Sequence, residues 1–199
     1  MEYHVEKIRC GGCGLLVPNY DCAILVSEES PKQELCSACF NLVMAKNTGC
    51  DKFTNVSFDP IGMIDAAGDR HLFQFKTLLL GDILSIEALE VQEEEVKGYQ
   101  FQILGRPEDD QLVLLGGLIQ KMRRSLSVRH LVDDERYGLS VVGNTVRGRF
   151  EWDDDSDGEL PLLVIDGREI SWYELGEMLS SFEGSQFKLE IIDPSGDVS

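Results

Sequence analysis

The chain has 199 residues, a formal net charge of −18 and 43% hydrophobic residues. This length allows one small module and one domain of ordinary size with its own hydrophobic core. The negative charge opposes long-range approach to the phosphate backbone of nucleic acids. Most of the excess lies at the end, because residues 151–199 contain 14 acidic and 2 basic residues.

The sequence contains no obvious export or membrane signal. The first residues, Met1–Lys7, lack an apolar core, and no run of about 18 apolar residues occurs. We therefore expect a chain that is neither exported nor membrane-spanning and that resides in the cytoplasm. In that reducing compartment, cysteines are thiols or metal ligands rather than disulfides.

Four cysteines form two Cys-x-x-Cys pairs, Cys10–Cys13 and Cys36–Cys39, which are separated by 22 residues. Each pair can place two thiolates on one side of a tight turn, and two such turns complete the tetrahedral sulfur shell that Zn²⁺ prefers. We predict one structural Zn²⁺ per chain, bound by Cys10, Cys13, Cys36 and Cys39. The alternative, two disulfides, would require a secreted protein.

The second cysteine pair leads into a helical pattern, with Phe40, Val43 and Met44 on one side and Gly49 as its end. A glycine-flanked turn, an extended segment and a final Cys pair at a helix start resemble the treble-clef or zinc-ribbon class. The resemblance covers residues 8–48. Because that class has many functions, the resemblance implies a structure and no activity.

Three other residues are alternative ligands: Cys22, Cys50 and His4. Cys22 lies in an apolar alternation and Cys50 follows the predicted helix. A free buried cysteine is an ordinary small hydrophobe, so we favour packing over ligation for both. His4 lies outside both Cys turns.

Strands and helices are expected throughout the remaining chain. Apolar stretches bounded by turn residues predict strands at 15–17, 22–26, 58–64, 72–80, 83–91 and 99–103. The first two should form one hairpin and the stretches 72–80 and 83–91 another. Residues 110–126 predict a helix, capped by Asp109 or Asp110. Its expected buried face consists of Leu112, Leu115, Ile119, Met122 and Leu126.

The last part of the chain predicts two further hairpins and a second amphipathic helix. One hairpin joins 138–142 to 146–152, and the other turns at Asp166–Gly167, a type I′ signal. A capping box at Ser171–Glu174 predicts a helix start, and the alternation at 187–191 predicts a closing strand.

These elements predict an α+β protein. A treble-clef-like Cys₄ module at 1–52 should precede a domain with an antiparallel sheet and at least two amphipathic helices at 53–193. A sub-boundary is expected near 105–110 and a frayed tail at 194–199.

Catalytic signals are few, so we expect no enzyme. His4, His71 and His130 have no accompanying nucleophile or carboxylate pattern, and we favour a structural role for each. The run 153–159 begins like a calcium-binding EF-hand loop, but position twelve is Val164 and not Glu. A solvated acidic loop is the better interpretation. A metal-dependent hydrolase built on this loop is the weakest alternative.

A basic stretch offers an alternative function in binding nucleic acid. Its candidate contacts are Lys121, Arg123, Arg124 and Arg129. The local excess of positive charge is small, so we favour pairing of these cations with the C-terminal acids and expect no binding to bare duplex DNA.

We predict a non-enzymatic zinc-binding adaptor that binds another protein. An aromatic residue beside dense negative charge suits recognition of a basic partner surface, because carboxylates steer the encounter and the ring anchors it. The candidate contacts are Trp152, Asp153, Asp154, Asp155 and Asp157. We favour the simpler alternative, in which Trp152 completes the core and the acids keep a loop solvated.

Overall fold

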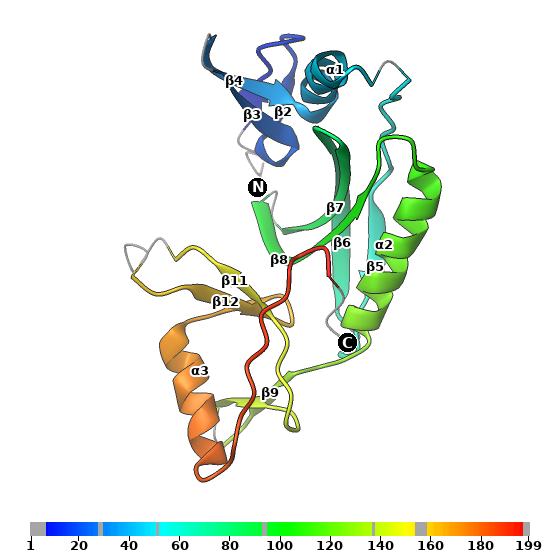
Figure 1. The fold of residues 1–199 in the computed structure, drawn as a ribbon. Helices are drawn as coiled ribbons and strands as arrows, with labels where there is room; N and C mark the ends of the chain where they lie inside the picture. The colour runs from blue at the N-terminus through cyan, green and yellow to red at the C-terminus, as the bar shows by residue number, and fades with distance from the viewer. Residues whose placement is uncertain are drawn as a thin grey trace, which may run out of the picture.

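The computed structural model describes residues 7–27, 30–50, 52–92, 95–136, 138–153 and 159–196. These residues form helices and antiparallel sheets, which confirms the α+β prediction. The described residues bury three hydrophobic clusters, one after another along the chain. In Figure 1 the cysteine-rich module lies at the top, the largest sheet in the middle and the C-terminal unit at the bottom.

The N-terminal module consists of two antiparallel ribbons followed by a helix. Its elements are β1 (Lys7–Arg9), β2 (Leu16–Pro18), the 3-10 turn η1 (Asn19–Asp21), β3 (Cys22–Ser27), β4 (Ser30–Cys36) and α1 (Ser37–Thr48). β1 pairs with β2, and β3 pairs with β4. The predicted hairpin of 15–17 with 22–26 is therefore wrong. Pro18 and η1 change the direction of the chain between the two stretches. β2 therefore pairs with β1, across the first Cys turn, and β3 pairs with β4, which follows it in the sequence.

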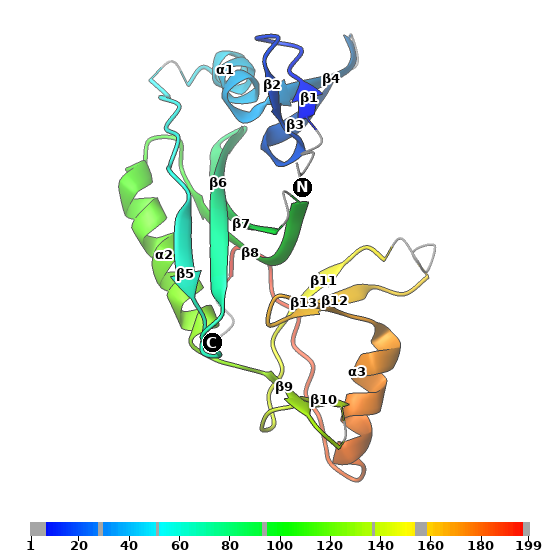
Figure 2. The ribbon, with the colours of Figure 1, turned by 180° about the vertical axis from the view of Figure 1, so that it is seen from behind.

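A four-stranded antiparallel sheet forms the middle of the molecule. Its strands, in spatial order, are β5 (Ile61–Ile64), β6 (Arg70–Leu80), β7 (Ile83–Gln92) and β8 (Glu95–Gly105). The predicted hairpin across Gly81 is confirmed, because this glycine has a φ of 74° and Leu80 pairs with Ile83. Figure 2 shows β5 and β6 from the side opposite to Figure 1.

Helix α2 (Gln111–Leu126) packs against β7 and β8. Asp110 caps its first turn and accepts a hydrogen bond from Leu112 N at 2.8 Å. Leu118, Met122 and Leu126 are buried against the sheet. The expected position of Leu112 on the buried face is wrong, since its side chain is 68% exposed in the capped first turn, beyond the sheet contact.

The C-terminal unit combines two small sheets with a helix. Its elements are β9 (Leu131–Asp134), β10 (Gly138–Val141), β11 (Arg149–Glu151), β12 (Leu162–Ile165), β13 (Arg168–Ile170), α3 (Trp172–Leu179) and the 3-10 turn η2 (Ser180–Phe182). β10 pairs with β9, and β11 pairs with β12, which pairs with β13. The predicted hairpin of 138–142 with 146–152 is wrong, because β10 pairs with β9 instead. β9 begins at Leu131, which is buried in the C-terminal hydrophobic cluster, and the polar residues after Leu131 continue the strand.

The predicted turn and the predicted helix start in this unit are both confirmed. Asp166 and Gly167 have φ angles of 50° and 72°, as a type I′ turn requires. Ser171 and Glu174 form the predicted capping box at the start of α3.

The predicted closing strand at 187–191 is wrong. Residues 185–193 belong to no strand, and Phe187 is 92% exposed. In Figure 1 this segment runs as an extended chain from the end of α3 toward α2. Within the ranges given above, no helix is long and apolar enough to cross a membrane.

Candidate metal centre

The first Cys turn lies between β1 and β2. Cys10 N donates to Leu15 O and Gly14 N donates to Cys10 O, both at 2.9 Å, and Gly14 has a φ of 75°. A Cβ atom on Gly12 would lie 3.0 Å from Cys39 Sγ. Glycine at position 12 therefore allows the first turn to approach the second pair closely.

The second Cys pair lies where β4 meets α1. Cys36 is the N-cap of the helix, and its Sγ accepts a hydrogen bond from Cys39 N at 3.5 Å. The backbone at the C-cap, Gly49, is left-handed with a φ of 71°. The predicted helix is confirmed, and its first turn holds Cys39 beside the glycine turn.

The four sulfur atoms converge on one point. The Sγ atoms of Cys10, Cys13, Cys36 and Cys39 all lie within 4.8 Å of one another, and Cys13 Sγ is 4.0 Å from Cys36 Sγ. A tetrahedral ion held at about 2.3 Å from each sulfur keeps its sulfurs about 3.8 Å apart. The donor set and the spacing therefore fit a four-thiolate metal site.

Backbone hydrogen bonds prepare this site for anionic sulfur. Burial disfavours the Cys10 thiolate, but the N–H groups of Cys13, Cys36 and Gly12 outweigh it and lower the pKa of Cys10 to about 6. Burial and the neighbouring thiols raise the pKa of Cys39 to about 12. A metal bound by all four thiolates must displace protons from the remaining thiols, so its affinity should increase with pH.

The alternative ligands do not join this cluster. Cys22 faces Cys36 across the β3–β4 ribbon and Cys50 follows α1, and neither belongs to the group of converging sulfurs. His4 lies outside the described residues. None of the six cysteines forms a disulfide in this structure, and the convergence of both Cys pairs on one point favours the metal site over the disulfide alternative.

The module is seated on the central sheet. Figure 1 shows α1 across the upper end of β6. Leu78 of β6 packs against the hydrophobic cluster that contains Cys10 and Cys36. Lys76 Nζ donates to Cys22 O at 2.7 Å. The metal site is therefore part of a surface shared with the sheet.

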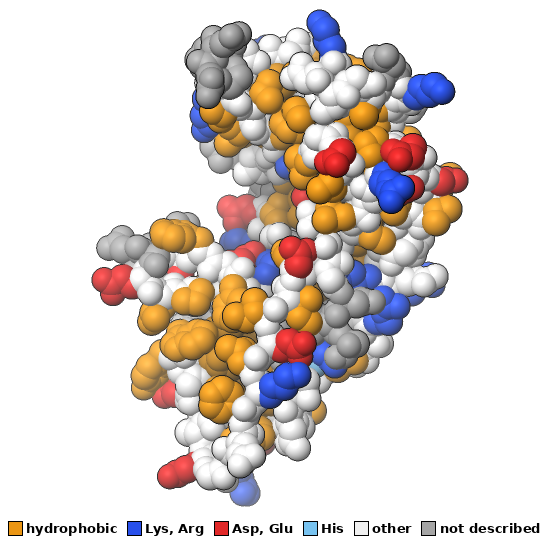
Figure 3. All heavy atoms as spheres, viewed as in Figure 1, with side chains coloured by type: hydrophobic (Ala, Val, Ile, Leu, Met, Phe, Trp, Pro, Cys, Tyr) orange, Lys and Arg blue, Asp and Glu red, His pale blue; other side chains and the backbone are white. Residues whose placement is uncertain are grey.

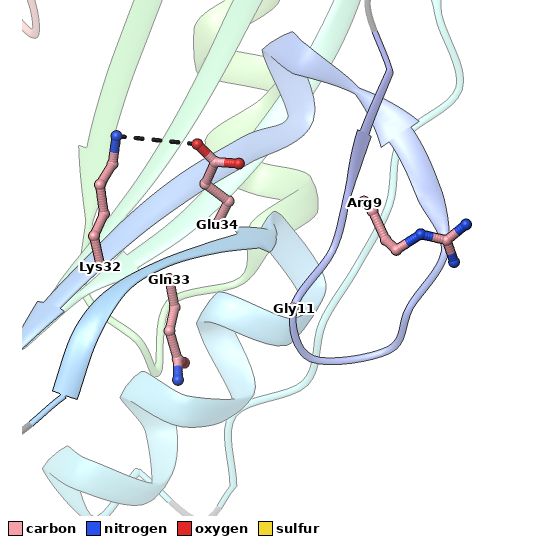
Figure 4. Close-up of a pocket in the computed structure, with 5 residues that line it drawn as sticks. All are labelled: Arg9, Gly11, Lys32, Gln33 and Glu34. Atoms are coloured by element: carbon pink, nitrogen blue, oxygen red, sulfur yellow. Dashed lines mark ion pairs between the residues drawn. The ribbon is translucent and has the colours of Figure 1, made fainter.

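An open hollow of about 290 Å³ adjoins the first Cys turn. It is lined by Arg9, Gly11, Lys32, Gln33 and Glu34. Figure 4 shows Lys32 and Glu34 facing each other, at a distance of 4.0 Å, while Arg9 and Gln33 point in other directions. Because these polar groups do not converge, the hollow lacks the arrangement of a small-molecule site.

The candidate partner contacts are only partly described. Trp152 follows β11 and is 70% exposed, so the interpretation that it completes the core is wrong. β11 ends at Glu151, which leaves the indole beyond the last strand pair. Asp153 is described, whereas Asp154, Asp155 and Asp157 lie outside the described residues.

Two cations of the basic stretch bind carbonyl oxygens of the chain. Lys121 Nζ donates to the carbonyl oxygens of Pro194 and Gly196 at 2.8 and 2.7 Å. Arg129 Nε donates to Leu131 O at 2.6 Å. The remaining two, Arg123 and Arg124, are exposed in the last turn of α2.

A buried ionic cluster went unrecognised in the sequence. His71 Nδ1 lies 2.7 Å from Glu90 Oε1, and Asp65 Oδ2 lies 3.4 Å from His71 Nε2. Glu90 is 2% exposed, and its second oxygen accepts from Tyr99 N at 2.8 Å. The sequence signal was a glutamate on the apolar face of β7, two residues after Ala88.

Three family models match the chain, and each is described as a domain of unknown function. They cover residues 9–51 (DUF7685), 54–127 (DUF7686) and 130–196 (DUF7713). Each range contains all the buried residues of one of the three hydrophobic clusters, in the order of the chain. No curated protein and no solved structure matches the chain.

Proposed function

We propose that the protein is a non-enzymatic adaptor whose N-terminal module is held together by one structural Zn²⁺. Four converging thiols support this assignment, because zinc favours tetrahedral sulfur sites and a closed Cys₄ shell leaves no coordination position for water or substrate. The chain itself would reside in the cytoplasm, where thiols stay reduced.

The partner that we propose is a protein with a basic surface. The observation that carries this proposal is Trp152, a large aromatic side chain that is 70% exposed beside Asp153 in the acidic end of the chain. Exposed aromatics often become the buried anchors of protein interfaces, and surrounding carboxylates accelerate the approach of a cationic partner.

Affinity purification of the intact, zinc-loaded protein tests this role. A partner that binds through Trp152 should be lost from a Trp152→Ala variant and should be released by salt. Trp172→Ala is the matched control, because Trp172 is also exposed but belongs to α3 and is not adjacent in sequence to Asp153. Recovery of the same proteins by the wild type, the Trp152→Ala variant and the Trp172→Ala variant would contradict the proposed surface.

Charge neutralisation adds a kinetic test once the partner is purified. Asp153→Asn, combined with the same change at Asp154, Asp155 and Asp157, should slow association and flatten its salt dependence. Dissociation should change less, because these side chains act mainly during the approach. An unchanged association rate at low salt would exclude the acidic run from the interface.

A further inference from the structure

The C-terminal segment 186–192 has the sequence pattern of a strand but no strand partner. Phe187, Leu189 and Ile191 alternate along it and are 92%, 66% and 74% exposed. Lys188 and Glu190 lie between these apolar residues, and Lys188 Nζ is 2.9 Å from Glu190 Oε2, so the two charged side chains share one side of the chain. The segment is thus an extended ribbon with separate apolar and charged faces.

The backbone of this segment is available for pairing. Within the described part of the chain, residues 186–192 make no backbone hydrogen bond to another segment. Both ends are nevertheless held in place: Ser185 N donates to Phe182 O at 3.0 Å, and Lys121 binds the carbonyls of Pro194 and Gly196. An extended segment fixed at both ends loses little additional entropy when it pairs with another strand.

The residue order of this segment is complementary to itself. In an antiparallel pair centred on Leu189, each Phe187 faces the other chain's Ile191, and each Lys188 faces the other chain's Glu190. Such opposite pairs stabilise neighbouring strands, and reciprocal contacts of this kind define a two-fold interface. We propose that a second copy of this chain pairs with residues 187–191 and forms a two-fold symmetric dimer.

The charge distribution favours a copy of the chain as the occupant. Two chains of net charge −18 repel each other, so a contact between copies must be locally neutral. Residues 186–192 contain one lysine and one glutamate, and Lys188 is one of only two basic residues after position 150. Figure 3 shows hydrophobic side chains gathered over the lower part of this face of the molecule. Self-pairing does not depend on the proposed adaptor role.

Analytical ultracentrifugation of the zinc-loaded full chain, from about 5 to about 500 μM, tests this proposal. The wild type should show a monomer–dimer equilibrium. Lys188→Glu and Glu190→Lys should each weaken self-association about tenfold or more, because each places like charges opposite one another at two points. An equimolar mixture of the two variants should regain the wild-type dimer fraction within about twofold, since the mixed pair restores both opposite-charge contacts.

Lys52→Glu is the matched control for Lys188→Glu, because it makes the same change of charge at an exposed residue far away in the sequence. It should leave self-association at the wild-type level. A wild type that stays monomeric over the whole concentration range would overturn the proposal. The segment would then be a candidate binding site for a different protein. Single variants that associate normally, or a mixture that does not recover, would overturn it as well.

Discussion

Leu79 donates its backbone N–H to the side-chain oxygen of Asn41 over 2.7 Å, so a helix residue takes the place of a neighbouring strand. The side-chain Nδ2 of Asn41 in turn donates to Thr77 O at 2.8 Å and to Asn55 Oδ1 at 2.9 Å. β5 pairs only with the first half of β6. Asn41, which is 1% exposed, therefore covers the free edge of β6 and fixes the cysteine module to the sheet.

Replacing Asn41 with Ala should lower the free energy of unfolding by about 2–3 kcal/mol, because the N–H of Leu79 and the carbonyl of Thr77 lose their partners in a buried place. Urea unfolding of the zinc-loaded chain measures this loss. Asn55→Ala is the control: Asn55 is exposed, and its loss should cost less than about 1 kcal/mol. Equal losses in the two variants would show that the amide does not hold the module.

The correct sequence predictions rest on signals that a few neighbouring residues contain. The Asp166–Gly167 turn needs only left-handed backbone angles, and the capping box needs Ser171 and Glu174 three residues apart. The Cys pairs are equally local, because each turn brings its own two sulfurs together. Their spacing therefore predicted which four thiols converge.

The incorrect predictions depend on contacts between distant residues. Leu131 begins a strand because it is buried in the C-terminal core, although the residues after it are polar. The alternation at 187–191 is a strand signal, but no strand of the described chain pairs with it. The pair of His71 and Glu90 was invisible for the same reason, since 19 residues and a hairpin separate them.

Loss of one ligand should release the metal and unfold the N-terminal module. Cys36→Ser removes both a ligand and the thiol at the N-cap of α1, so elemental analysis should find no bound zinc. Cys22→Ser and Cys50→Ser should each retain about one zinc per chain, because neither sulfur belongs to the cluster. A Cys36→Ser protein that keeps its zinc would disprove the four-thiolate site.

Limited proteolysis locates the damage. Cleavage of Cys36→Ser should begin within residues 7–50, while the sheet and α2 resist because their cluster around Phe73 and Met122 is intact. Simultaneous loss of both regions would mean that the module and the sheet unfold as one unit.

Bare duplex DNA should not bind at physiological salt. The acidic end of the chain repels a polyanion within a Debye length of about 8 Å, and Lys121 already binds backbone carbonyls. A gel-shift titration at about 150 mM salt checks this expectation. If micromolar binding occurs, Arg123→Ala and Arg124→Ala should reduce both the affinity and its salt dependence, because these exposed cations would be the phosphate contacts.

The buried histidine should make the stability of the central sheet depend on pH. Hydrogen bonding to Glu90 raises the pKa of His71 despite its burial, and Asp65 raises it further. Burial opposes ionisation of Asp65, but hydrogen bonds from Asp69 N and His71 lower its pKa. A raised histidine pKa means that the folded state binds the proton more tightly than the unfolded state does.

The stabilisation from His71 should therefore be complete below pH 6.5, the ordinary histidine value, and should be lost as the pH rises through the raised pKa. The Asp65 contribution is present above its ordinary value of 3.8 and is lost as the pH falls through the lowered pKa. The free energy of unfolding of wild type minus that of His71→Gln isolates the histidine, because the zinc site and the other acids cancel. This difference should shrink as the pH rises above 6.5 and through the raised pKa of His71.

Glu90→Gln provides the second arm of a double-mutant cycle. The amide keeps an oxygen that can accept from His71 Nδ1 but removes the buried negative charge that faces it at 2.7 Å. In the Glu90→Gln background, replacing His71 should give a smaller dependence on pH, because the charge that raises the histidine pKa is gone. An unchanged pH dependence in that background would mean that Glu90 does not hold the proton on His71, and that Asp65 alone does so.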